Sequence, residues 1–163
     1  MSSRSRYIAL VIAVVTLTSG VTLQGQSQAG QSNKRAIEGS WRISGNLGPN
    51  RPPAAPATVE GLVTYDAGGG FVFTDNTPTN AHGSWEYAGG GRFNTTFVRF
   101  ILNPEGQIVA TLHVRSRIRL NFTNDEATSE EEVEIRQFPS GILLAGYNGA
   151  TSVARRIRVE PIQ

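Results

Sequence analysis

The chain has 163 residues, of which 39% are hydrophobic and 17% charged, with no Cys, one Met, 18 Gly and 8 Pro. The length suits a single domain, and the lack of Cys excludes disulfides, thiolate metal sites and a Cys nucleophile. The ordinary apolar content argues against disorder over most of the chain.

The N-terminus has the pattern of a secretory signal peptide. Arg4 and Arg6 precede the apolar run 7–17, and a small-x-small cleavage pattern follows at 27–29, with 19–21 as a competing site. The run is shorter than the roughly 20 residues that a membrane-spanning helix needs. We therefore expect a signal peptide over residues 1–29, a flexible polar leader over 30–36 and a folded domain over 37–163. The mature protein would be secreted or periplasmic without a membrane anchor, and the alternative is an uncleaved N-terminal anchor.

Signal cleavage would also change the net charge. The 15 Lys and Arg residues include Arg4 and Arg6, so 13 remain beside 13 Asp and Glu. Nucleic-acid-binding proteins carry a basic surplus, so no nucleic-acid partner is expected. The two His and few Asp residues lack metal-ligand spacing, and no Gly-x-Ser-x-Gly nucleophile motif is present. The sequence thus predicts no metal, no cofactor and no catalytic residue.

From Ile37 onward, short β-prone runs alternate with Gly, Pro and Asn, and no segment shows the apolar spacing of a helix. The Pro-rich segment 48–56 reads as a surface loop near a barrel end, because Pro cannot donate a ladder hydrogen bond. Consecutive hairpins then predict an all-β fold, an eight-stranded antiparallel up-and-down barrel. The expected strands are 39–45, 57–65, 70–75, 82–88, 92–102, 107–120, 127–138 and 142–159, the last one interrupted.

Hairpin geometry predicts which strand positions lie opposite each other. The loop 104–106 would pair Asn103 with Gln107 and place Phe100 opposite Ala110. In the strand that follows, even positions are apolar and odd positions polar, so the even face is expected inside.

A four-residue turn around 123–124 would place Arg117 opposite Glu130 and Arg115 opposite Glu132. Such opposite charges are typical of a solvated outer face, and the run is interpreted in that way rather than as a binding patch.

The same alternation predicts an inward set that mixes apolar and polar side chains. Buried polar groups can satisfy one another or a trapped water, or they can line a ligand cavity. The predicted inward set is Trp85, Tyr87, Asn94, Thr96, Val98, Phe100, Ala110, Leu112, Val114, Ser116, Val133, Ile135, Ala145 and Tyr147. From it we take as candidate ligand-binding residues Trp85, Tyr87, Asn94, Thr96, Phe100, Ser116 and Tyr147.

The segment Gly39-Ser40-Trp41 opens the first predicted strand, and here the chain resembles the lipocalin-like (calycin) barrels, which begin with Gly-x-Trp. This resemblance implies that Trp41 closes one barrel end, with an Arg or Lys of the last strand across its ring. Arg155 is the expected partner, on the assumption that Ile157 and Val159 face inward. Avidin-like, allene-oxide-cyclase-like and dirigent-like barrels are alternative comparisons. The segments 82–86 and 97–100 also look like uncharacterised secreted bacterial proteins.

The predicted function is the binding of a small, largely apolar molecule in the lumen of the barrel. One alternative is a cyclase or isomerase that shapes its substrate by the cavity, similar to allene-oxide cyclases. Another is a filled barrel that serves as a protein-interaction module. His82, Ser84 and Glu86 share one strand face, opposite Trp85, and are therefore expected to point outward rather than into a catalytic site.

Overall fold

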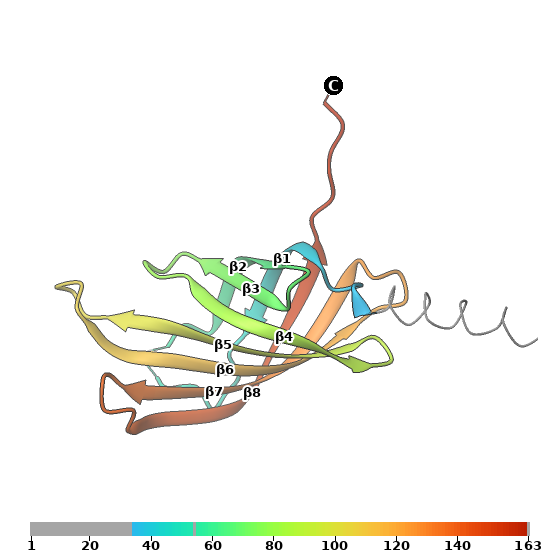
Figure 1. Cartoon of the computed structure of the whole chain (residues 1–163). Coiled ribbons are helices and arrows are strands. Elements are labelled where there is room, and N and C mark those ends of the chain that lie inside the picture. Colours follow the sequence, from blue (N-terminus) through green and yellow to red (C-terminus); the bar gives the residue numbers. More distant parts are fainter. Residues whose placement is uncertain (1–33, 54, 163) are drawn as a thin grey trace, which may run out of the picture. The chain divides into compact units, whose positions relative to one another are not determined.

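The structure, a computed structural model, describes residues 34–53 and 55–162. The predicted signal peptide and most of the predicted leader lie outside these residues. The strands are β1 (Gly39–Asn46), β2 (Thr58–Tyr65), β3 (Gly70–Asp75), β4 (Ala81–Gly89), β5 (Arg92–Leu102), β6 (Ile108–Leu120), β7 (Glu126–Gln137) and β8 (Leu143–Arg156). Each strand pairs with the next, and β8 pairs with β1, so the sheet closes (Figure 1). The predicted eight-stranded antiparallel up-and-down barrel is confirmed.

Turn chemistry explains where β5 ends and β6 begins. The Asn103 N–H donates to the Gln107 carbonyl at 2.9 Å, and the Gly106 N–H donates to the Asn103 carbonyl at 3.0 Å. Gly106 has φ +79°, a conformation that glycine adopts without steric cost. The predicted pairing of Asn103 with Gln107 is confirmed.

Just beyond this turn, the register of β5 and β6 shifts by one residue. Leu102 pairs with Ile108, whereas Ile101 pairs with Ala110, so Val109 is the extra residue of a β-bulge. A one-residue shift turns every following side chain of the partner strand to the other face of the sheet.

The bulge corrects the predicted orientation of β5. Asn94 and Thr96, expected to face the lumen, are exposed on the outer face. Phe100 is also not an inward side chain: it is 46% exposed at the barrel rim, with its ring against Phe138. The side chains of β5 that face inward are Phe93, Thr95, Phe97, Arg99 and Ile101.

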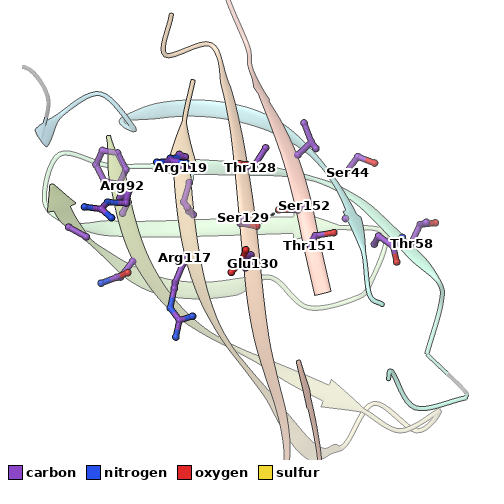
Figure 2. A pocket seen from close by; sticks show the side chains of 17 residues that line it. Ser44, Thr58, Arg92, Arg117, Arg119, Thr128, Ser129, Glu130, Thr151 and Ser152 are labelled. Atoms are coloured by element: carbon purple, nitrogen blue, oxygen red, sulfur yellow. Dashed lines mark hydrogen bonds between the residues drawn. The ribbon is translucent and has the colours of Figure 1, made fainter. Parts of the chain in front are cut away.

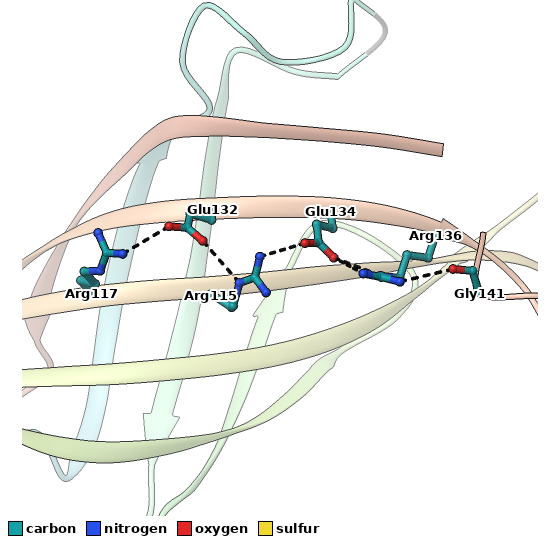
Figure 3. Close-up of polar contacts among 6 residues, drawn as sticks. All are labelled: Arg115, Arg117, Glu132, Glu134, Arg136 and Gly141. Carbon is teal, nitrogen blue, oxygen red and sulfur yellow. Dashed lines mark hydrogen bonds and ion pairs between the residues drawn. The ribbon is translucent and has the colours of Figure 1, made fainter. Parts of the chain in front are cut away.

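The register between β6 and β7 follows the prediction, with Arg117 opposite Glu130 and Arg115 opposite Glu132. The arginines and glutamates alternate along the outer face as a chain of ion pairs (Figure 3). Arg115 Nη2 lies 2.8 Å from Glu134, and Arg117 Nη2 lies 3.3 Å from Glu132. Exposed pairs of this kind contribute about 0–1 kcal/mol each, which fits a solvated face.

The best-packed part of the core lies at one end of the barrel. Trp41, Phe93 and Ile37 are its largest fully buried side chains. Trp85 and Tyr87 of β4 face inward as predicted, and both rings pack against Phe93, with centroids 5.8 and 5.3 Å away. This packing fills the end of the barrel at which β1 begins.

No helix within the described ranges has the length and apolar character needed to cross a membrane.

Candidate functional site

A cavity of about 820 Å³ occupies the lumen. Pockets that take small molecules usually measure about 300–1,000 Å³ and are mainly apolar with a few polar groups. The cavity has this character, because large apolar side chains from most strands form its wall. They include Ile43, Val63, Phe71, Phe73, Phe97, Leu112, Val114, Ile118, Val133 and Ile135.

Trp41 and Arg156 close one end of this cavity. The Arg156 guanidinium carbon lies 4.1 Å from the centre of the Trp41 ring, within cation–π distance. The same guanidinium donates to the carbonyls of Ala36, Glu38 and Asn124, so it joins three chain segments across the barrel end.

The prediction of Arg155 as the cation–π partner is therefore wrong, and the partner is the next residue, Arg156. The Arg155 side chain is 79% exposed and pairs with Glu126 on the outer face. The cause is a second bulge: Glu131 pairs with Ala150 but Glu132 with Asn148, which leaves Gly149 as the extra residue of β8. Beyond this bulge the even positions of β8 face inward.

The opposite end of the lumen is bordered by two loops. Pro52, Ala55 and Pro56 of the Pro-rich loop line the cavity, as do residues 76–79 between β3 and β4. The Pro-rich loop is held by Arg51, whose guanidinium donates to the carbonyls of Gly48 and Ala55. Its predicted place near a barrel end is confirmed.

A buried ion pair lies beneath this rim. Arg99 Nη1 is 2.6 Å from Asp75 Oδ2, and the two side chains are only 16% and 1% exposed. Burial on its own would raise the pKa of Asp75, but hydrogen bonds from Thr77 and the Arg99 guanidinium outweigh it and lower that pKa. The pair leaves this side of the lumen without net charge.

The pKa of Asp75 predicts a loss of stability in acid. A carboxyl with a lowered folded-state pKa stabilises the fold above its unfolded-state pKa, and this stability disappears as the pH falls through the folded-state value. A pKa that is lower by one in the folded state than in the unfolded state corresponds to about 1.4 kcal/mol of unfolding free energy. We expect Asp75→Asn to reduce the difference in unfolding free energy between pH 7 and pH 2.5, measured by urea denaturation.

Glu105→Gln is the control for this experiment, because Glu105 is an exposed carboxyl at a hairpin tip. An Asp75→Asn profile that runs parallel to the wild-type profile over this pH range would contradict the prediction.

Polar groups gather on one wall of the lumen, on β6, β7 and β8. The Ser129 hydroxyl donates to Glu131 Oε1 at 2.9 Å and lies 2.6 Å from the Ser152 hydroxyl. Since the single Ser129 proton is used toward Glu131, Ser152 is the donor of the second bond. Ser116 lies directly opposite Glu131 in the ladder between β6 and β7. Glu131 is thus a carboxylate that faces the lumen.

Two tyrosines add phenol groups to the cavity lining, Tyr147 from β8 and Tyr65 from β2. Tyr65 and Tyr147 line the cavity, and Tyr65 is only 8% exposed. Burial raises the pKa of Tyr65 far above its usual value, and the charge of Glu131 adds to the effect. Burial and Glu131 also raise the pKa of Tyr147, against a smaller opposing effect of Arg51. Both hydroxyls are therefore protonated donors at neutral pH.

Some of the predicted ligand-binding residues line the cavity in the structure, and others do not. Ser116 and Tyr147 line the cavity, and Phe100 contributes at its rim. Trp85 and Tyr87 belong to the packed barrel end instead. Asn94 and Thr96 lie outside, where the Asn94 amide donates to Glu86. The cavity-lining polar residues that the prediction missed include Tyr65, Asp75, Thr95, Arg99, Ser129, Glu131 and Ser152.

A second hollow, of about 950 Å³, lies on the outer face across β5, β6, β7, β8 and β1 (Figure 2). Arg92, Arg117 and Arg119 stand at one end of it, and hydroxyl groups such as those of Thr128 and Thr151 follow. Its side chains are mostly exposed, in contrast to the enclosed wall of the lumen. The lumen is accordingly the better candidate for a small-molecule site.

His82 and Glu86 are exposed on the outer face of β4, as expected. His113 is bonded to the Thr111 hydroxyl at 3.0 Å. Over residues 34–53 and 55–162, no three His, Asp or Glu side chains come together as metal ligands. Neither histidine lines the cavity, so the chemistry of the lumen depends on its carboxylates, hydroxyls and Arg99.

Comparison of this chain with models of protein families and with curated proteins gives no match, so the barrel and its cavity are the basis of the functional conclusion.

Proposed function

We propose that the barrel binds a small, largely apolar molecule in its lumen. The observation that carries this proposal is the cavity of about 820 Å³, which has a mainly apolar wall with a smaller number of polar groups. Such a wall favours burial of an apolar ligand, which gains roughly 25 cal/mol for each Å² of apolar surface removed from water. A barrel filled by its own side chains would lack this space. Together with the predicted signal peptide, the proposal describes a secreted or periplasmic binding protein.

Two adjacent threonines of β5 provide a direct test. Thr95 is 5% exposed and lines the cavity, whereas Thr96 is exposed on the outer face. We expect Thr95→Phe to weaken the binding of pyrene, an uncharged fluorescent hydrocarbon, by at least about tenfold, or about 1.4 kcal/mol. Thr96→Phe adds the same ring outside and should leave pyrene binding unchanged, as measured by fluorescence titration.

Far-UV circular dichroism would check that both variants fold. If Thr95→Phe does not fold, Ser116→Phe repeats the experiment from the facing position in β6. Binding that is weakened equally by the inward and outward variants, or by neither, would contradict binding in the lumen.

A cyclase or isomerase of the cavity-templated kind would use the same lumen, so the fate of the bound molecule separates the two functions. Native mass spectrometry of protein purified from its own host would identify a molecule that co-purifies. A binding protein returns that molecule unchanged after incubation, whereas an enzyme converts it.

A further inference from the structure

We propose that the lumen is selective for an apolar amine, whose protonated head group would pair with Glu131. This inference rests on the proposed function and names the chemical class of the ligand. It follows from the charge balance of the cavity and from the hydrogen-bonding state of the groups around this carboxylate.

Glu131 is the partly buried carboxylate of the lumen wall that has no ion pair with a described residue. Glu60 also borders the cavity, but it is exposed and accepts a hydrogen bond from the Ser44 hydroxyl. Asp75 and Arg99 also carry charges in this wall, but they form an ion pair at 2.6 Å and neutralise each other. Glu131, by contrast, accepts a hydrogen bond from the neutral Ser129 hydroxyl and makes no ion pair with a described residue. Arg51, whose charge lowers the pKa of Tyr147, does not line the cavity and donates to carbonyls of its own loop. A carboxylate in such surroundings is costly unless a cation or several donors compensate it.

Tyr65 is the second residue that bears on the ligand class. It is more than nine-tenths buried and lines the same cavity as Glu131. Glu131 lines the cavity together with Tyr65 and Tyr147, and its charge raises the pKa of both phenols. An ammonium group at Glu131 would have this carboxylate and neighbouring hydroxyl oxygens as acceptors.

The same arrangement disfavours an apolar acid. A ligand carboxylate would enter a low-dielectric space that already holds one negative charge, and like charges at short range repel strongly there. The cation that could have received it, Arg99, is already paired with Asp75. A neutral alcohol would be intermediate, because it can donate to Glu131 without compensating its charge.

The test compares dodecylamine, dodecanol and dodecanoic acid as competitors of pyrene at neutral pH and below their aggregation concentrations. The three share one alkyl chain, so differences between them report on the head group. We expect the amine to bind at least about tenfold more tightly than the acid, a difference of about 1.4 kcal/mol or more. Equal affinities of amine and acid, or a preference for the acid, would overturn the inference.

Glu131→Gln keeps the size of the side chain and removes its charge. It should weaken dodecylamine binding by about tenfold, or about 1.4 kcal/mol, and leave pyrene and dodecanol little changed. Glu130→Gln is the matched control: the neighbouring position changes the net charge equally but faces outward. An amine preference that survives Glu131→Gln, or that Glu130→Gln reduces equally, refutes the assignment. If the wild-type protein does not bind pyrene at all, the proposed function of the lumen as a binding site is refuted instead.

Discussion

Replacing Trp41 with Ala is expected to lower the free energy of unfolding by about 3–5 kcal/mol, the range for a large buried aromatic residue. Trp41 is 0% exposed, and its indole N–H donates to the Ile37 carbonyl at 2.9 Å. The substitution would also remove the ring beneath the Arg156 guanidinium, a contact that contributes roughly 0.5–2 kcal/mol. Urea denaturation followed by far-UV circular dichroism measures the loss.

Trp85→Ala serves as the comparison, because Trp85 is the other tryptophan of the chain and is only partly buried. Its indole N–H also donates to a backbone carbonyl, that of Asp66 at 3.0 Å. The two variants thus lose the same ring and the same kind of hydrogen bond but differ in burial. If Trp41→Ala proves no more destabilising than Trp85→Ala, Trp41 does not hold the barrel end closed.

The strands and their order could be predicted because this chain marks its turns clearly. Gly, Pro and Asn separate the β-prone runs, and the ends of each predicted strand lie within three residues of the observed ones. The outer ion pairs of β6 and β7 were also predictable, because no bulge interrupts the ladder between Ala110 and Leu120. Alternation is reliable wherever the ladder is continuous.

The two bulges explain the wrong predictions about side-chain orientation. Val109 shifts β5, so Asn94 and Thr96 turn outward and Arg99 turns inward. Gly149 shifts β8, so Arg156 rather than Arg155 covers Trp41. Val109 carries no sequence signal, since Val is an ordinary strand residue. Gly149 does carry one, because Gly within a strand often marks a bulge.

The inward orientation of Glu131 could have been predicted from the sequence alone. This residue has the same parity as Val133 and Ile135, which were predicted to face inward, and the structure has all three lining the cavity. The predicted inward set nevertheless omits Glu131. Tyr65 and Asp75, in contrast, depend on how β2 and β3 curve around the lumen, which the pattern of residues does not determine.

Gly83→Ala is expected to destabilise the barrel by about 3 kcal/mol, the upper end of the usual cost of overpacking. Gly83 lies in the ladder between Phe71 of β3 and Phe97 of β5. Those two rings meet edge to face across it, with centroids 5.7 Å apart. A Cβ at this position would lie 2.3 Å from the Thr96 carbonyl oxygen and 2.7 Å from atoms of both phenylalanines. The backbone oxygen cannot move aside without breaking the ladder between β4 and β5.

Gly146→Ala is the control for this change, since Gly146 is also a strand glycine and lies at an exposed position of β8. A Cβ there would come no closer than 3.7 Å to the Val133 carbonyl oxygen. Where the backbone accepts it, Gly→Ala stabilises by about 0.4–1 kcal/mol through the unfolded chain. The two variants should therefore shift the urea midpoint in opposite directions. A Gly83→Ala protein as stable as Gly146→Ala would show that the Phe71 and Phe97 rings do not pack over Gly83 as described.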